Sequence, residues 1–533
     1  MHPQRGGAFG ATRRAGGPRR VGAVVVAVVV ALLAGGTPVL LAHAPPAGAV
    51  GAGNILKRWA ATMSGSQTLT QDQAVTDARN YDVLVAKKDT FTPYLGAMRA
   101  ANPGVKVLDY LNGAYAQQNQ GPTSGAYPTT WYAKDVSGQY ITSRVGGNWL
   151  MDVSNPSWIQ DRVQTCSSFI TGSGYDGCYL DVLGNVSVSP SYVSSVPFNQ
   201  VTGQNWTAPD WLTATANLGA AVKNANSSAF IVGNGLQNGQ QYFTASQGPT
   251  SKLLSGMDGG NAQGWLRGAS DAIDSFETEA DWLNDVNLVV DAGARGRSAL
   301  TMTKVWNVSP TPTQQQIDAV HRYALASFLL GTNGNQYFLF DTDPDDGAVA
   351  TDHPYDHVNV GTATDSFSKD ASGAYVRHFT MGVAVVNPGT TTVTESLGAP
   401  MTDLDGNVMS QVTLPPDTGD VFTTSAASTT TSTPCTGTLT GTAYKGGRAT
   451  AKKALAGVVL TATPTSGTPA SAITDAAGAY SVSVPCGTYT KAATGPETKD
   501  RVCHFVDKKG STTAVATVTN GSNDIENLFC LRK

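Results

Sequence analysis

Asp181 ends a short apolar run and is therefore a candidate catalytic or ligand-binding residue. The run Gly177-Cys178-Tyr179-Leu180 has the composition of a buried β-strand, and strand alternation places Tyr179 and Asp181 on one face. Parallel β/α barrels hold their catalytic groups at the carboxyl ends of such strands. Asp181 could instead cap the next turn, although Val182-Leu183-Gly184 continues without a helical pattern.

Three more aspartates follow apolar residues near the ends of predicted strands: Asp109, Asp152 and Asp341. Each alone could be a helix cap or half of an ion pair. Four acidic strand ends on one face would, however, supply the two carboxyl groups that hydrolysis of a glycosidic bond requires. We therefore expect Asp109, Asp152 and Asp341 to contact substrate.

Glutamate is scarce in this part of the chain, where only Glu277 and Glu279 occur. Glu279 follows Thr278 at a predicted helix start, where a carboxylate complements the helix dipole. Glu277 precedes that cap and is open to a catalytic role.

Aromatic and amide side chains next to the predicted strand ends could bind sugar. Aromatic rings stack on sugar rings, although each could also pack in the core. Trp265 is the preferred platform, because it follows Gly264 just beyond a strand. Asn234 lies in a glycine-rich loop after another strand, and that loop misses the spacing of a dinucleotide fingerprint. The predicted substrate-binding residues of this kind are Tyr110, Trp149, Asn234, Trp265 and Trp306.

These residues require an alternation of strands and helices to position them. Eight short apolar strands alternate with helical stretches, which predicts a (β/α)₈ TIM barrel over residues 50–365. The predicted helices include 156–170, 209–224, 278–292 and 313–330, and the first begins with the cap sequence Ser154-Asn155-Pro156. The predicted strands are 81–86, 105–111, 149–153, 176–181, 230–233, 257–263, 300–306 and 336–341.

The remaining sequence divides into four segments. Residues 1–49 read as a signal peptide, with arginines before an apolar run and small-residue cleavage patterns after it. Residues 366–422 alternate as strands and predict an antiparallel β-sandwich packed on the barrel. Residues 423–434 form a Thr/Ser linker, and residues 435–533 predict a separate β-sandwich. The fold class is thus α/β with two smaller β domains.

Charge and cysteine content restrict the partners. The formal net charge is −4, and loss of the first 49 residues removes five arginines and no acidic residue. An acidic body argues against nucleic acid, and no later segment predicts a membrane span. Six cysteines in an exported chain suggest disulfides, with Cys166 and Cys178 expected to pair. The four in the tail, at 435, 486, 503 and 530, leave three pairings open.

We expect no metal or other cofactor. No two cysteines have the CxxC spacing of zinc or redox sites. The acidic run from Asp341 to Asp346 has the oxygen density that calcium prefers, but it departs from an EF-hand loop, and a solvated acidic loop is the favoured reading.

Two segments together resemble a known family. The segment Trp149 to Pro156, and then Asp176-Gly177-x-x-x-Asp181, is similar to glycoside-hydrolase barrels whose fourth strand reads DG-x-x-x-D. The resemblance extends roughly from Trp59 to Phe422. It implies that Asp181 pairs with a carboxylate, usually Glu, at the end of strand six.

Gln263 stands where that strand-six glutamate is expected. An amide can neither donate a proton as a general acid nor attack as a carboxylate. Either Asp258, Glu277 or another strand-end aspartate takes the second catalytic role, or the barrel binds sugar without cleaving it. We keep Gln263 as a substrate-binding residue.

The tail resembles a second family. Asp475, Gly478, Tyr480 and Ser481, followed by Val484-Pro485-Cys486-Gly487, are similar to carboxypeptidase-regulatory-like domains of the transthyretin type. The resemblance implies a spacer or an attachment module, through which the protein could bind a cell surface.

The sequence therefore predicts a secreted, extracellular glycoside hydrolase that acts on a polysaccharide or cell-surface glycan, with Asp181, Asp258 and Glu277 as candidate catalytic groups. A non-catalytic carbohydrate-binding barrel is the first alternative. A structural or adhesive surface protein is the second.

Overall fold

The computed structural model describes residues 53–532 apart from short gaps. The described chain divides into two compact units, Met1–Ser425 and Ala426–Lys533. The predicted signal peptide and most of the predicted linker lie outside the described residues, as does the acidic loop after Thr342. The gaps are 63–68, 88–89, 343–351, 425–435, 448, 465–468, 497–500, 506–509 and 519–522.

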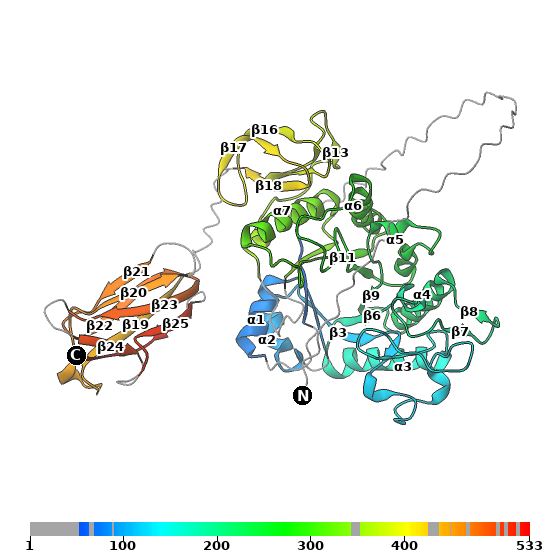
Figure 1. The fold of residues 1–533 in the computed structure, drawn as a ribbon, viewed down its shortest axis with the longest axis horizontal. Helices are drawn as coiled ribbons and strands as arrows, with labels where there is room; N and C mark the ends of the chain where they lie inside the picture. Colours follow the sequence, from blue (N-terminus) through cyan, green and yellow to red (C-terminus); the bar gives the residue numbers. More distant parts are fainter. Residues whose placement is uncertain are drawn as a thin grey trace. The chain divides into compact units, whose positions relative to one another are not determined.

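The first unit contains a parallel β-barrel (Figure 1). Eight strands pair side by side in sequence order, and β12 meets β1 through a parallel bridge between Arg58 and Phe338. The Phe338 amide donates to the Lys57 carbonyl at 2.9 Å and so helps to close the ring. The strands are β1 (Trp59–Thr62), β2 (Val83–Ala86), β3 (Lys106–Asn112), β6 (Gly177–Asp181), β9 (Phe230–Asn234), β10 (Gly259–Ala262), β11 (Ser298–Lys304) and β12 (Tyr337–Asp341).

Helices lie between successive strands, as the sequence predicts. Polar residues start them: Asn155 accepts from the Ser157 amide with Pro156 next to it, and Thr207, Thr278 and Thr313 cap three others. None of the helices in the described part of the chain has the length and apolar composition of a membrane span. The helices are α1 (Gln71–Asn80), α2 (Leu95–Ala101), α3 (Pro156–Ser168), α4 (Ala208–Ala225), α5 (Gly239–Phe243), α6 (Glu279–Ala294) and α7 (Gln314–Gly331).

One predicted barrel strand is wrong and one was missed. Trp149–Leu150 form β5, which pairs antiparallel with β4 (Tyr115–Ala116) in the long connection between β3 and α3. Its apolar composition resembles that of a barrel strand. Leu150 and Met151 are fully buried, but against the connection that contains the hairpin. The missing first strand is β1, whose sequence Trp59-Ala60-Ala61-Thr62 lacks the Val and Leu residues that marked β2. A second hairpin, β7 (Phe198–Asn199) with β8 (Gln204–Asn205), lies between β6 and α4.

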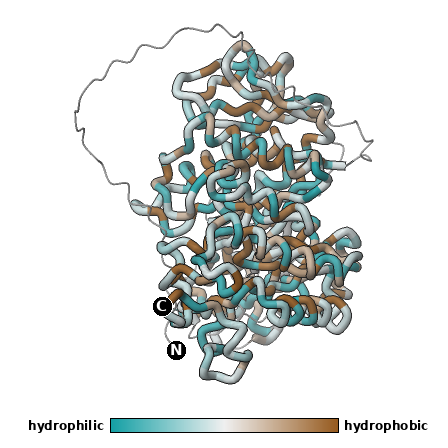
Figure 2. The backbone as a smooth tube through the Cα atoms, turned by 90° about the vertical axis from the view of Figure 1, so that its right-hand side faces the viewer, coloured by the Kyte–Doolittle hydropathy of each residue, from teal (hydrophilic) through white to brown (hydrophobic). Residues whose placement is uncertain are grey.

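Alternation along each strand separates two sets of side chains. Inward-facing residues from the eight strands fill the barrel, among them Leu108, Tyr179, Val232 and Leu300. The other set faces the helices. Figure 2 shows hydrophobic and hydrophilic stretches alternating along the chain. The inward set ends in polar side chains at the carboxyl ends of the strands.

The predicted disulfide is present. Cys166 on α3 bonds to Cys178 on β6, with their Cα atoms 6.0 Å apart. Cys178 points away from the barrel interior, on the face opposite Tyr179 and Asp181. The bond therefore fixes the helix to the strand that carries Asp181.

The β domain after the barrel is antiparallel: its six strands pair along one path, and apolar side chains from five of them form a cluster of their own. Its arrangement as a sandwich stays a prediction. Strands β15 and β18 pack against α7. From β14, Arg377 donates to the carbonyls of Leu329, Leu330 and Thr332 at the end of that helix. In sheet order the strands are β13 (Ser368–Lys369), β14 (Tyr375–Phe379), β15 (Gly382–Asn387), β18 (Thr418–Thr424), β16 (Val393–Thr402) and β17 (Val408–Leu414).

The second unit consists of β-strands with their own apolar clusters. Asp475 holds the predicted turn, because its carboxylate accepts from the Ala477 and Ala479 amides. Cys503 and Cys530 form a disulfide between neighbouring strands. The strands are β19 (Thr436–Lys445), β20 (Val459–Pro464), β21 (Ala470–Ile473), β22 (Ala479–Pro485), β23 (Gly487–Thr494), β24 (Arg501–Phe505), β25 (Thr513–Val518), β26 (Asn523–Ile525) and β27 (Leu528–Arg532).

Candidate active site

The structure places Asp181 in a hydrogen-bonded network at the mouth of the barrel. Tyr110 from β3 donates its hydroxyl to Asp181 Oδ2 at 2.5 Å, and Asn234 from β9 donates Nδ2 to Oδ1 at 2.8 Å. Hydrogen bonds to both oxygens fix the position of the carboxylate. The arrangement suits a nucleophile, a base or a stabiliser of positive charge.

Tyr110 is a fixed donor to that anion. Burial and then the adjacent Asp181 charge raise the pKa of Tyr110 well above its ordinary value, so its hydroxyl keeps its proton. Asn112, two residues further along β3, donates Nδ2 to the Tyr110 oxygen at 3.3 Å. The predicted contact residues Tyr110 and Asn234 thus lie against Asp181.

Gln263 lies beside Asp181, directly after β10. The Asn234 nitrogen that donates to Asp181 also donates to Gln263 Oε1 at 3.1 Å. The Asp181 and Gln263 side-chain oxygens are therefore at most about 6 Å apart.

A second tyrosine near Asp181 was missed from the sequence. Tyr192 lies in the connection from β6 to α4, with its ring edge against Tyr115 at a centroid distance of 6.2 Å. Burial and the Asp181 charge raise the pKa of Tyr192 to about 12. No sequence pattern marked it, because it comes from an irregular loop.

The far side of the mouth carries Lys304 and Asp341, at the ends of the neighbouring strands β11 and β12. Lys304 is 9% exposed, and its Nζ lies 4.8 Å from the centre of the Trp306 ring. Burial lowers the pKa of Lys304 to about 8, while Asp341 acts in the opposite direction. Lys304 was also missed, although it shares the inward alternation of Leu300 and Met302.

Backbone strain is concentrated at the same end of the barrel. Four non-glycine residues with positive φ follow four successive strands, β6, β9, β10 and β11. Such conformations cost of order 1–3 kcal/mol each and gather at functional sites. The four residues are Val182 (φ 55°), Gln237 (68°), Leu266 (66°) and Asn307 (53°).

Two predicted contact residues do not reach this mouth. Asp109 is fully buried and lies on the opposite face of β3 from Tyr110, so it faces the helices. Asp152 does not end a barrel strand: it precedes α3, where its carboxylate accepts from the amide and hydroxyl of Ser154. Its role is that of a turn-forming aspartate.

Asp258 is at the wrong end of the barrel for catalysis with Asp181. It precedes β10, and its Oδ2 accepts from the Ile231 amide at 2.8 Å and pairs with Lys223 at 2.9 Å. Asp176 before β6 does the same for the Val107 amide. Each is followed by a glycine where two strands approach closely: a Cβ at Gly177 would lie 1.9 Å from the Phe230 carbonyl oxygen. Asp258 therefore has the same structural role before β10 as Asp176 has before β6.

Glu277 also does not join Asp181. It hydrogen-bonds Asp285 on α6, whose carboxylate accepts from the Leu266 and Gly239 amides in the loops behind the mouth. Burial raises the pKa of Glu277 to about 7 and that of Asp285 well above its ordinary value. Glu279 binds Lys369 and Tyr375, as a structural carboxylate.

This carboxyl pair predicts a pH-dependent stability. Because folding raises both pKa values, the folded protein binds protons more tightly, and the stabilisation is lost as pH rises through about 7. We expect the free energy of unfolding to fall by at least about 2 kcal/mol between about pH 5 and pH 8. Glu277→Gln should remove the part of this fall that Glu277 contributes in urea titrations, and Glu279→Gln should keep the whole fall. An unchanged fall in Glu277→Gln would contradict the assignment.

The predicted aromatic platforms differ in accessibility. Trp265 is fully buried, donates to the Asp285 carbonyl at 2.9 Å and packs edge-on against Phe328, so it belongs to the core. Trp149 is half-buried in the β4–β5 hairpin and donates to the Gln118 carbonyl. Trp306 is half-buried within the inner cluster at the mouth and remains a candidate platform.

The described residues contain no group of three or more His, Cys, Asp or Glu side chains that could hold a metal ion. The mouth combines the carboxylates of Asp181 and Asp341 with amides, tyrosines and a lysine. A closed β/α barrel with such groups at the carboxyl ends of its strands has the form of a carbohydrate-active barrel enzyme.

Comparison with known families agrees with this class. Residues 99–383 match the profile described as "Hypothetical glycosyl hydrolase family 15", and the chain belongs to this family. The match covers the barrel from α2 to β12 and the first strands of the following sheet.

Among solved structures, this chain is similar to the α-amylase AmyB from Thermotoga neapolitana, with 11% identity and a TM-score of 0.40 over 69% of this chain and 98% of that one. Amy13B of Eubacterium rectale gives 11% identity and a TM-score of 0.42 over 69% and 96%. Ega3 of Aspergillus fumigatus gives 12% and 0.34 over 56% and 96%. No curated protein sequence matches the chain.

Proposed function

We propose that this protein hydrolyses O-glycosidic bonds in a polysaccharide or cell-surface glycan, with Asp181 as the essential carboxylate. The observation that carries the proposal is the pair of hydrogen bonds that Tyr110 and Asn234 donate to Asp181 at the barrel mouth. The family match supports the same reaction class. Reducing-sugar release over a panel of polysaccharides tests it, because a binding or adhesive protein releases none.

The leaving oxygen must receive a proton from another group. Asp181 accepts hydrogen bonds on both oxygens, Gln263 is an amide, and Asp258 and Glu277 lie elsewhere. We assign Lys304 as the general acid that donates this proton. The charge of Asp341 beside it favours the protonated ammonium form of Lys304. A lysine whose pKa is about 8 holds its proton at neutral pH and releases it more readily than an ordinary lysine.

The proposed reaction accounts for each bond and each proton. The bond between the anomeric carbon and the leaving oxygen breaks as Lys304 transfers its proton to that oxygen. Asp181 attacks the anomeric carbon or activates a water that does so, and water finally supplies the new hydroxyl. If Asp181 attacks, Lys304 takes its proton back from the water that cleaves the glycosyl intermediate. If Asp181 activates the water, Asp181 receives that proton and passes it to solvent, from which Lys304 is reprotonated.

A carbohydrate-binding barrel without catalysis is the second candidate, because Gln263 occupies the partner position beside Asp181. Gln263→Glu discriminates the two functions. If Lys304 already supplies the proton, the new carboxylate lies beside Asp181, raises the pKa of the pair and lowers hydrolysis at neutral pH by about tenfold. A rise in hydrolysis from an inactive wild type would instead favour the binding barrel. Gln263→Leu controls for loss of the amide.

We further infer that the protein works outside the cytoplasm and that its C-terminal unit attaches it to a surface. Disulfides in both units, Cys166–Cys178 and Cys503–Cys530, support an oxidising compartment. Binding of the isolated 435–533 segment to cell-wall preparations tests the attachment, and its absence would leave a spacer role.

A further inference from the structure

A pocket of about 540 Å³ opens beside the mouth of the barrel, within the usual range of ligand pockets. Its lining comes from the segments that follow β6, β9 and β10. Asn185 lies four residues after Asp181, Gln237 three residues after Asn234, and Gly264 directly after Gln263. The pocket thus continues from the three strands whose ends form the Asp181 network.

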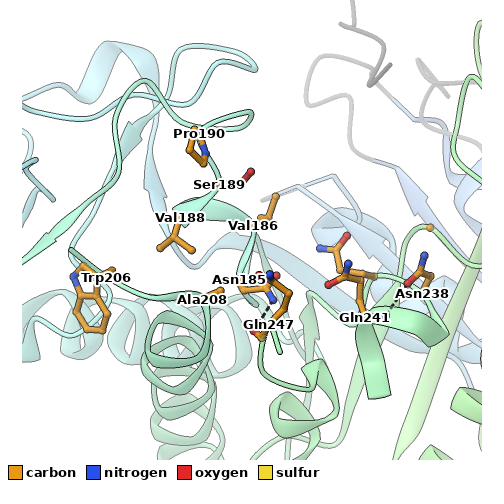
Figure 3. A pocket seen from close by; sticks show the side chains of 12 residues that line it. Asn185, Val186, Val188, Ser189, Pro190, Trp206, Ala208, Asn238, Gln241 and Gln247 are labelled. Carbon is orange, nitrogen blue, oxygen red and sulfur yellow. Dashed lines mark hydrogen bonds between the residues drawn. The ribbon is translucent and has the colours of Figure 1, made fainter. Parts of the chain in front are cut away.

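The lining is uncharged throughout and rich in primary amides. Figure 3 shows Trp206 at one end, with the amides of Asn185, Gln247, Gln241 and Asn238 gathered toward the other. Each amide offers two donors and an acceptor, which suits the paired hydroxyl groups of a sugar. An indole face suits the apolar face of a sugar ring.

Several lining residues are held in place. Asn185 donates Nδ2 to the backbone carbonyl of Gln247 at 3.1 Å. This bond links the loop after β6 to the loop before β10. The Asn238 side chain caps α5, because its Oδ1 accepts from the Gln241 backbone N–H at 3.0 Å. Trp206 meets Trp211 edge-on at a centroid distance of 5.4 Å. A preorganised pocket loses less conformational entropy when a ligand binds.

We propose that this pocket is a subsite for an uncharged stretch of glycan next to the bond held at Asp181, so that the substrate is a neutral polysaccharide. The inference rests on the proposed function and names its substrate class. A uronate or sulfated chain would require basic partners, and a free amino sugar would require acidic ones. The pocket lining offers neither.

Binding to the full chain carrying Asp181→Asn tests the proposal without cleavage. The probes are neutral glucan hexaoses with α-1,4, β-1,4 and β-1,3 linkages, together with hexagalacturonate and hexaglucosamine, each measured by titration calorimetry. We expect at least one neutral hexaose to bind at least about tenfold more tightly than either charged hexamer. Binding of no probe, or tighter binding of a charged hexamer, would overturn the proposal.

Substitutions of pocket residues test whether the neutral hexaose binds in this pocket. Gln241→Ala should weaken the bound neutral hexaose by about three- to tenfold, as expected for loss of hydrogen bonds worth about 1 kcal/mol. Gln240→Ala, one residue earlier on α5 and outside the pocket, is the matched control. Trp206→Ala should weaken binding further, and Trp206→Phe should restore part of it. Unchanged affinity in both Gln241→Ala and Trp206→Ala would overturn the subsite.

Failure of the subsite and failure of hydrolysis give different results. If wild-type protein cleaves a polysaccharide and Asp181→Asn does not, hydrolysis stands even when the pocket variants leave binding unchanged. If wild-type protein cleaves nothing but binds a neutral hexaose that Gln241→Ala weakens, the subsite stands and hydrolysis fails.

Discussion

Asp181→Asn is expected to lower the hydrolysis rate by at least about 10³-fold, because the amide carries no charge to attack or to stabilise the anomeric centre. The fold should remain. The asparagine oxygen can still accept from Asn234, and its amide group can donate to the Tyr110 oxygen once that hydroxyl rotates. We therefore expect the free energy of unfolding to change by less than about 1 kcal/mol.

Asp176→Asn is the matched control, because Asp176 lies at the opposite end of the same strand. Its carboxylate binds the Val107 amide and Arg99, so the change affects stability and leaves chemistry intact. The measurement is reducing-sugar release on the best wild-type polysaccharide, with thermal unfolding of both variants. Wild-type activity in Asp181→Asn would end the assignment of Asp181.

Lys304→Met is expected to lower hydrolysis of unactivated substrates by about 10²- to 10⁴-fold, the usual contribution of a general acid. Aryl glycosides with a dinitrophenolate leaving group need no proton and should lose far less. The wild-type rate should fall as pH rises through about 8, where Lys304 loses its proton, and Lys304→Met should lack that limb. Equal losses on both substrates would contradict an acid role.

Lys106→Met is the control for removal of a half-buried lysine. Lys106 begins β3, and its Nζ lies 5.4 Å from the centre of the Phe230 ring, at the opposite end of the barrel from Lys304. It makes the same kind of ring contact without access to the mouth. Lys106→Met should keep the wild-type pH profile.

The strand-end pattern predicted three residues that the structure brings together. Asp181, Asn234 and Gln263 follow three neighbouring strands of one parallel sheet, whose carboxyl ends necessarily meet at one mouth. Periodicity and helix caps predicted most helices, and a spacing of 12 residues allowed the Cys166–Cys178 bond. These features depend on local sequence, which is why they could be predicted.

The sequence patterns did not distinguish the two ends of a strand. Asp258 was taken as an end residue although it precedes β10, as Asp176 precedes β6. The shared Asp-Gly pair before both strands is a signal that could have corrected the assignment, because each aspartate binds the amide of a residue in a neighbouring strand. Asp109 was chosen beside Tyr110 although only one of them can face the barrel interior.

The sequence by itself determined the barrel class, the disulfide between α3 and β6, and Asp181 as a strand-end carboxylate. Only the tertiary structure decided which further side chains lie at the mouth and which predicted ones do not. Tyr192 comes from an irregular loop, Lys304 faces inward through the register of β11, and Trp265 is buried under α6 and α7. Such contacts join residues far apart in the chain, and no local pattern encodes the packing that brings them together.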